Sequence, residues 1–320
     1  MRILSGIQPS GALHIGNYFG MMQPAVALQT EGEALYFIAD YHALTTLRDP
    51  EALRANSRRV ALDFLACGLD PERATLFRHS DVPQVTELAW ILSTLAPMGL
   101  LERATSYKDK LARGLPATVG LFGYPILMAA DILIYDSDVV PVGKDQKQHI
   151  EITRDLAVKM NENYGQIFKL PESRIRAASE TVPGIDGQKM SKSYRNNIDI
   201  FGEEKEIRKR VMSIVTDSAA VDAPKDPAQS TIVKLYSLVA SKHEIAEMRE
   251  QFVKGGTGYG DFKNELFEKL WEYFEPMHRR RDEILNDKSY IDDVLARGAK
   301  RANEIADQVM GRVRQAVGLR

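Results

Sequence analysis

Three short segments near the N-terminus, apolar at their centres, limit the folds open to this chain more than any other feature. They are RILSGI (2–7), ALYFIAD (34–40) and RATLFRHS (73–80). Continuous apolar runs of this length are typical of strands buried on both faces, as in parallel sheets. The segments between them have helical patterns, and an alternation of strand and helix predicts an α/β fold with a parallel sheet.

The clearest helix signals lie between the second and third of these segments. In DPEALRANSRRVALDFLACG (49–68), Asp49 is placed to cap the N-terminus, Pro50 takes the first helical position, and Gly68 follows the last turn. Residues 83–130 are mostly helical and interrupt the alternation, which we interpret as an insertion that covers one edge of the sheet. The segment 137–157 then predicts a strand, a glycine turn and a helix, so that the sheet resumes.

The residue pattern of the sequence changes after about residue 200, where long, charged, amphipathic segments dominate. In one of them Ile305, Val309, Val313 and Val317 are spaced four apart and mark one helix face. We therefore predict two domains. Residues 1–200 form a Rossmann-like parallel sheet domain with a helical insertion at about 83–130, and residues 201–320 form an all-helical domain.

Composition excludes several classes of protein. With 44% hydrophobic and 27% charged residues the chain has the make-up of a soluble globular protein, and its net charge of −2 gives no global attraction to nucleic acid or membranes. A single cysteine, Cys67, permits no intrachain disulfide and suits a reducing cytoplasm. The N-terminus has no apolar segment long enough for a signal peptide. The apolar run 119–135 contains Asp131, so we expect buried protein there rather than a membrane span.

The turn SGIQPSGALHIGN (5–17) joins a predicted strand to a predicted helix. Ligands of open α/β sheets bind beyond the carboxyl ends of the strands, and exposed N–H groups at a helix start favour phosphate. Gly16 permits close approach of a ligand to the backbone, and His14 can donate to a phosphate oxygen. An ordinary strand-to-helix turn with a polar cap is an equally good reading of this stretch alone.

A second candidate lies far along the chain in GQKMSKSYRN (187–196), which gathers three basic residues and two serines after a glycine. Alone it is more often a solvated loop than an anion site. However, HIGN (14–17) and KMSKS (189–193) together, in this order, resemble the two signatures of class I aminoacyl-tRNA synthetases. The resemblance gives Gly184 and Gly187 a further expected use, as flexible points of a loop that closes over ATP.

The segments SGIQPSGALHIGNY, DYHA, YPILMAADIL and VPVGKDQKQHIEITRDLA further resemble the bacterial tryptophanyl-tRNA synthetases over essentially the whole chain. The resemblance implies a cytoplasmic homodimer that activates L-tryptophan with ATP and Mg²⁺ and transfers it to tRNA(Trp). It also implies an anticodon-binding role for residues 201–320. No Cys/His cluster indicates a structural metal, so we expect no metal ligands from the protein.

The resemblance assigns site residues position by position. The implied catalytic residues are His14, Asn17, Lys110, Lys189 and Lys192. Contacts to ATP are implied for Gln8, Pro9, Ser10, Gly16, Asn17, Gly143, Lys144, Asp145, Val182, Lys189, Met190, Ser191, Lys192 and Ser193. Contacts to tryptophan are implied for Asp131, Tyr124, Met128, Gln146, His42, Leu4, Val139 and Val142. Asn17 replaces the usual second histidine of the first signature, and Lys144 stands where relatives often have glutamate.

The partner of Asp131 bears on which amino acid the protein binds. A carboxylate in an apolar segment needs a partner, since its unpaired burial is costly. A helix N-cap is the ordinary alternative, and the indole N–H of tryptophan is the partner that the resemblance implies. Such a hydrogen bond rejects phenylalanine but leaves tyrosine possible, because a tyrosine hydroxyl also donates.

Two further alternatives stay open at this point. One is a small-molecule nucleotidylyltransferase, against which the long helical C-terminal half argues. The other is a paralogue that binds tryptophan or tRNA without catalysis, against which the intact His14, Asp145, Lys189 and Lys192 argue. Basic residues at 297, 300, 301, 312, 314 and 320, and HRRR at 278–281, could follow tRNA phosphates or simply form solvated helix faces.

Overall fold

The computed structural model describes residues 1–320 except for 10, 105–113, 115, 144–145, 176–181 and 320. Its centre is a five-stranded sheet in the order β3-β2-β1-β4-β5, and every pairing is parallel. The strands are β1 (Arg2–Ile7), β2 (Glu33–Ile38), β3 (Ala74–Arg78), β4 (Val139–Val142) and β5 (Glu172–Ile175). The predicted parallel α/β fold is confirmed.

Alternate residues of β2 show that both faces of the sheet are buried. Tyr36 and Ile38 belong to one apolar core, whereas Leu35 and Phe37 belong to a second core on the opposite face. This two-sided burial explains why the strand reads as a continuous apolar run. The first core continues into the C-terminal helices, and the second is closed by the helices of the insertion.

The helices near the sheet follow the local signals. The chain after β1 is helical from Ile15 to Ala27, as α1 (Ile15–Asn17), a π-helical turn (Tyr18–Met22) and α2 (Gln23–Ala27). Helix α3 is Asp40–Ala43, and α4 (Pro50–Ala66) begins where Asp49 accepts hydrogen bonds from the N–H groups of Glu51 and Ala52. The insertion supplies α5 (Gln84–Ser93), α6 (Met98–Glu102) and α8 (Val119–Leu133), and α9 (Lys147–Tyr164) packs on α8.

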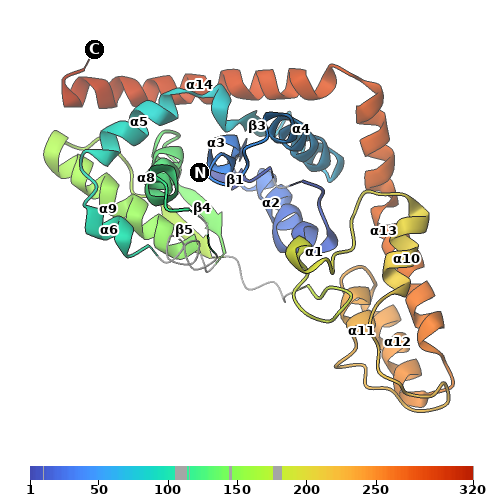
Figure 1. Ribbon diagram of the computed structural model, residues 1–320. Coiled ribbons are helices and arrows are strands. Elements are labelled where there is room, and N and C mark those ends of the chain that lie inside the picture. Colours follow the sequence, from blue (N-terminus) through green and yellow to red (C-terminus); the bar gives the residue numbers. More distant parts are fainter. Residues whose placement is uncertain (10, 105–113, 115, 144–145, 176–181, 320) are drawn as a thin grey trace.

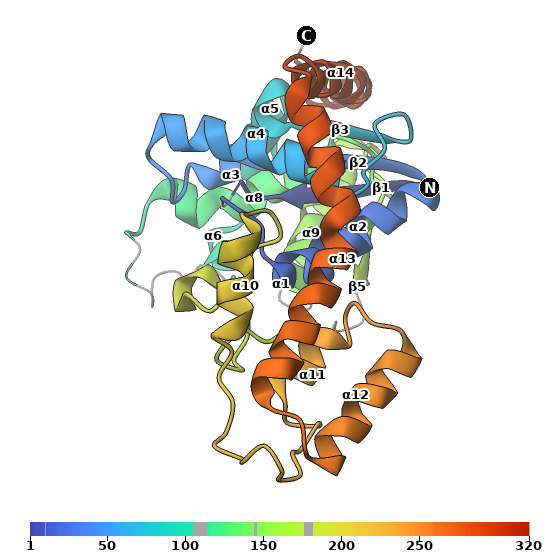
Figure 2. The ribbon, with the colours of Figure 1, turned by 90° about the vertical axis from the view of Figure 1, so that its right-hand side faces the viewer.

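The C-terminal half of the described chain is helical, as predicted. Helices α10 (Glu204–Met212), α11 (Thr231–Tyr236) and α12 (Lys242–Lys254) gather around the first half of the long helix α13 (Tyr259–Asn286) (Figures 1 and 2). Helix α13 then leads towards the sheet domain. The apolar segment 119–135 contains helix α8, which is exposed at its first residue, Val119, and buried in its last turns. No helix in the described parts of the chain is both long and apolar enough to cross a bilayer.

The last helix, α14 (Tyr290–Val317), lies along the sheet domain rather than with the other C-terminal helices (Figure 1). It packs on β3, and a Cβ placed on Gly298 would lie 1.9 Å from the carbonyl oxygen of Leu76. Ile305, Val309 and Val313 are buried in the core that also contains the insertion. The face predicted from their spacing therefore covers the sheet domain.

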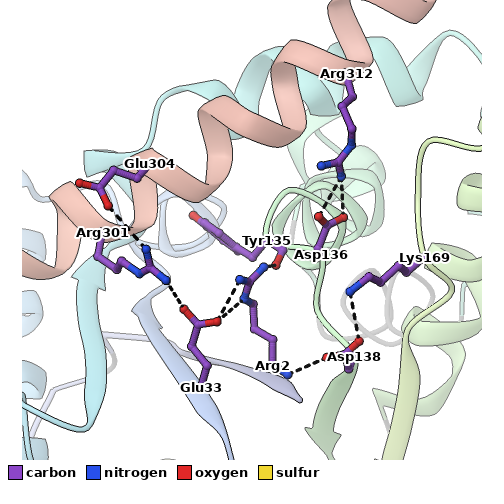
Figure 3. A network of polar contacts seen from close by, with 9 residues as sticks. All are labelled: Arg2, Glu33, Tyr135, Asp136, Asp138, Lys169, Arg301, Glu304 and Arg312. Carbon is purple, nitrogen blue, oxygen red and sulfur yellow. Dashed lines mark hydrogen bonds and ion pairs between the residues drawn. The ribbon is translucent and has the colours of Figure 1, made fainter.

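Ion pairs hold α14 in this position. Arg301 donates to Glu33 of β2 over 2.7 Å, and Arg312 donates to both carboxylate oxygens of Asp136 over 2.8 Å (Figure 3). Arg297 pairs with Glu72, and Arg314 pairs with Glu87 of α5. Each of these four arginines stays partly exposed and has an intramolecular carboxylate partner. In HRRR, Arg281 likewise pairs with Asp63 of α4 over 3.2 Å.

Candidate active site

A pocket of about 390 Å³ opens at the carboxyl ends of β1, β2 and β4. This is where open α/β sheets bind their ligands. Its wall includes nine residues that the sequence assigned to tryptophan or ATP, with one of them, Gly143, at the turn after β4. These are Leu4, Gln8, His42, Tyr124, Met128, Asp131, Val142, Gly143 and Gln146. Val139 is buried in β4 and does not line the pocket.

One face of α8 supplies two polar groups of the pocket, those of Tyr124 and Asp131. Tyr124, Met128 and Asp131 follow one another at intervals of four and three, so their side chains project from the same face of the helix. The Tyr124 hydroxyl lies 2.8 Å from Nε2 of His149 on α9. His149 is buried and does not line the pocket, so it fixes the Tyr124 hydroxyl from behind the pocket wall.

Asp131 is almost wholly buried and lies in the last turn of α8, which rules out the N-cap alternative. Oδ2 of Asp131 lies 2.8 Å from Nε2 of His42 in a well-aligned hydrogen bond. Oδ1 lies 2.7 Å from Nε2 of His79, but this contact is not aligned as a hydrogen bond, and Oδ1 has no other donor in the described structure. Burial acts to raise the pKa of Asp131, but His79 and His42 outweigh it and bring the pKa to about 2. The carboxylate is therefore charged at neutral pH.

The first turn forms a second polar site. Nδ1 of His14 accepts the N–H of Asn17 over 3.2 Å, while Oδ1 of Asn17 accepts the N–H of His14 over 3.3 Å. Burial, and then the nearby Lys192 ammonium, lower the pKa of His14 to about 4 against the opposing charge of Asp199. His14 is thus neutral at pH 7, and because Nδ1 accepts, its proton is on Nε2. The imidazole is a donor fixed in place by the backbone.

The segment that contains KMSKS is attached directly to this turn. The N–H of Ile15 donates to the carbonyl of Ile198 over 2.9 Å, and the N–H of Ile200 donates to the carbonyl of Leu13 over 3.1 Å. Sδ of Met190 lies 3.4 Å from the backbone nitrogen of Gly16. Two signatures that are far apart in the sequence therefore form one continuous structure.

Asn196 organises the loop from within. Its Oδ1 accepts the N–H of Ser191 over 2.7 Å, and its Nδ2 donates to Asp186 and to the carbonyl of Lys189. A Cβ on Gly184 would lie 2.4 Å from the Asn196 side chain, so close packing is one reason for that glycine. No local pattern indicated a role for Asn196, because that role depends on the folded loop.

The two lysines of KMSKS differ in their surroundings. Lys192 is half-buried, and its Nζ lies 3.5 Å from where a Cβ on Gly11 would be, beside the first turn. Burial, opposed by Asp199, lowers the pKa of Lys192. Lys189 is exposed. Lys192 is therefore the lysine that this conformation brings to the histidine turn.

Several predicted residues have other placements. Pro9, Gly16 and Asn17 lie at the first turn, and Ser191 and Ser193 lie in the loop, so none lines the pocket. Val182 is buried, and its carbonyl accepts the N–H of Met190. Ser10, Lys110, Lys144 and Asp145 lie outside the described residues. The sequence reasoning missed Gly6, Phe37, Ala39 and His79, which all lie at or just after strand ends, where the rule for parallel sheets would have located them.

Comparison with known proteins agrees with this geometry. Residues 1–275 match the family described as "tRNA synthetases class I (W and Y)". The chain belongs to this family of class I tRNA synthetases. It is 52% identical over 319 residues to the tryptophan–tRNA ligase of Fusobacterium nucleatum, with 99% of this chain and 98% of that protein covered. It is also 52% identical to the tryptophan–tRNA ligase of Rhodopirellula baltica, with both chains covered in full.

A solved structure provides a close likeness of the whole fold. The crystal structure of tryptophanyl-tRNA synthetase from Campylobacter jejuni, complexed with ADP and tryptophan, superposes with a TM-score of 0.96 at 48% identity. The likeness covers 100% of both chains. The predicted Rossmann-like domain with a helical C-terminal region is thus the architecture of this class of ligase.

Proposed function

We propose that this protein is a tryptophan–tRNA ligase, which activates L-tryptophan with ATP and transfers it to tRNA(Trp). The observation that carries the proposal is Asp131, a residue of the pocket wall whose buried carboxylate oxygen Oδ1 has no aligned donor in the described structure. A buried acceptor of this kind needs a hydrogen bond, and the indole N–H of tryptophan supplies one. The similarity to named tryptophan–tRNA ligases supports tryptophan over tyrosine.

The rest of the pocket suits an amino acid with a large apolar side chain. Leu4, Met128 and Val142 line the cavity around Asp131. We assign two polar residues, Gln146 and the Tyr124 that His149 holds, to the amino and carboxylate groups of the substrate tryptophan. A site that hydrogen-bonds its substrate in this way rejects phenylalanine strongly, because the analogue leaves the buried carboxylate unpaired.

In the first step the carboxylate oxygen of tryptophan attacks the α-phosphorus of ATP. The new bond is between that oxygen and phosphorus, and the bond from the α-phosphorus to the pyrophosphate oxygen breaks. The products are tryptophanyl-adenylate and pyrophosphate. A carboxylate is already ionised at pH 7, so the step needs no general base, only positioning and stabilisation of the charge that grows on the pyrophosphate.

The described part of the chain offers three donors for that charge. Neutral His14 can donate the proton on its Nε2 from the first turn, and Lys192 lies beside the same turn. Lys189, at the exposed side of the loop, completes the set that we assign to the phosphates. Mg²⁺ would enter with ATP as part of the substrate and would supply positive charge at the phosphates, without a set of protein ligands of its own.

The second step transfers the aminoacyl group to the 2′-hydroxyl at the 3′ end of tRNA and releases AMP. We assign anticodon recognition to the helical region formed by α10 to α13, and cytoplasmic action to the protein as a whole. Because the arginines of α14 are engaged in ion pairs, we place no tRNA phosphate contact on them.

We also propose that the protein acts as a homodimer through its insertion. Trp90 of α5 is 73% exposed, Met98 of α6 is 63% exposed and Val119 of α8 is 88% exposed. These helices contact one another through α8, and large apolar side chains left exposed on neighbouring elements are typical of a protein interface.

The function is tested by ATP–pyrophosphate exchange with each of the twenty amino acids, followed by charging of tRNA. We expect exchange that depends on tryptophan alone. Exchange with tyrosine would correct the substrate, and exchange with no amino acid would support a non-catalytic paralogue.

A further inference from the structure

His79 stands just beyond the tryptophan pocket and has no part in the proposed function so far. It follows β3 directly, at the carboxyl end of that strand, and its side chain is 1% exposed. It does not line the cavity, but its Nε2 lies 2.7 Å from Oδ1 of Asp131, which does. His79 therefore touches the pocket carboxylate from behind the wall.

Aromatic groups fix the plane of this imidazole. The ring packs edge to face against Phe37 at 5.3 Å and against Tyr41 at 4.9 Å, and it stacks on His42 at 5.6 Å. Neither nitrogen of His79 has an aligned hydrogen-bond partner in the described structure. Burying a polar ring in this way costs free energy unless one of its nitrogens makes a hydrogen bond. Oδ1 of Asp131 is the acceptor that Nε2 of His79 can reach.

His42, His79 and Asp131 also have the composition of a divalent-cation site, with donor atoms within 4.8 Å of one another. A tetrahedral zinc ion with ligands at about 2.0–2.2 Å holds its ligand atoms about 3.3 Å apart. The nitrogen–oxygen distances here are 2.8 and 2.7 Å. These are hydrogen-bond distances, so the geometry favours direct contact between the side chains over a shared metal.

We propose that His79 is a positioning residue for amino-acid selection, which donates to Oδ1 of Asp131 and aims that oxygen at the indole N–H. His42 already holds Oδ2 by a hydrogen bond, and donation from Nε2 of His79, 2.7 Å from Oδ1, would keep the carboxylate from rotating away from the substrate. An sp² oxygen accepts two hydrogen bonds, which leaves one position on Oδ1 for the ligand. The inference rests on the proposed role of Asp131 as the acceptor of the indole N–H.

The test pairs substitutions at residue 79 with a substrate that lacks the N–H. The probe is the tryptophan isostere in which sulfur replaces the indole nitrogen, 3-benzothienyl-L-alanine. The preference for tryptophan over this analogue is measured as a ratio of kcat/KM values in pyrophosphate exchange, for the wild type and for His79→Leu, His79→Gln and His79→Asn. Tyr41→Leu, which removes a ring that packs on His79 but keeps the imidazole, is the matched control.

We expect His79→Leu to lower the preference about tenfold, the effect of one hydrogen bond. A glutamine amide nitrogen can take the place of Nε2, whereas the shorter asparagine cannot, so His79→Gln should keep the preference and His79→Asn should lose it. Tyr41→Leu should keep it as well. If the leucine variant does not fold, the glutamine and asparagine variants decide the question.

Equal weakening of both substrates in the residue 79 variants would overturn the proposal, because that is the effect of lost packing alone. A wild-type enzyme that does not distinguish tryptophan from the analogue would refute the role of Asp131 and this inference with it. Tryptophan-dependent exchange would still stand in either case, so neither result would refute the ligase activity.

Discussion

Two glycines of α14 offer a test of how that helix is held. A Cβ on Gly298 would lie 1.9 Å from the carbonyl oxygen of Leu76 in β3, whereas a Cβ on Gly311 would meet no atom within 4 Å. Close carbon–oxygen contacts in proteins are about 3.3–3.6 Å. The substitution Gly298→Ala therefore requires α14 and β3 to separate by roughly 1.4 Å, while Gly311→Ala requires no movement.

The two changes should have opposite effects on the free energy of unfolding. Alanine is better than glycine in a helix by about 1 kcal/mol, so Gly311→Ala should stabilise the protein by up to that amount. At Gly298 the same gain is opposed by overpacking, which costs about 1–3 kcal/mol. A gap of 0.5–1 Å also loses a quarter to a half of the dispersion energy of the contacts on either side. We expect net destabilisation of about 2 kcal/mol.

Urea unfolding followed by circular dichroism measures both variants, with the midpoint and slope compared with the wild type. Similar slopes would allow the midpoints to be compared directly. The reasoning is wrong if Gly298→Ala is as stable as Gly311→Ala, because α14 would then not depend on close contact with β3.

Three other substitutions test the site and the assembly. Lys192→Ala should lower the adenylation rate far more than tryptophan affinity, measured by single-turnover kinetics and equilibrium binding, since its contact strengthens in the transition state; an unchanged rate would remove it from the mechanism. Burial raises the pKa of Asp63 from 3.8 to about 6 despite Arg281, so its folded pKa lies above its unfolded pKa. The resulting penalty is absent below pH 3.8 and complete above pH 6, and Asp63→Asn should raise the free energy of unfolding by about 3 kcal/mol at pH 8 but by little at pH 4; denaturation midpoints that shift equally at both pH values would contradict this. Trp90→Glu should yield monomers in sedimentation, whereas Val253→Glu, at an exposed residue of α12, should not; a dimeric Trp90→Glu variant would place the interface elsewhere.

The sequence predicted the elements with strong local signals. β1, β2 and α4 were evident because buried runs and caps such as Asp49 depend on neighbouring residues only. β5 was missed, since Glu172–Ile175 is short and polar and forms a strand through its pairing with β4.

Contacts between distant residues were harder to predict. The burial of Asp131 in an apolar segment indicated that it needed a partner, but nothing local identified His42 or His79. The amphipathic pattern of α14 predicted a buried face without saying which part of the molecule covers it. Its arginines then appeared equally suited to phosphates and to the carboxylates that they actually contact.

The position of α14 has a consequence for how the protein is made. β3 ends at residue 78 and forms one edge of the sheet, yet the helix that covers its backbone begins only at residue 290. While a ribosome synthesises the intervening chain, the outer N–H and C=O groups of β3 are open to pairing with other nascent strands. A protein truncated before α14 would therefore expose β3 as an open edge strand and tend to aggregate, in addition to losing tRNA charging activity.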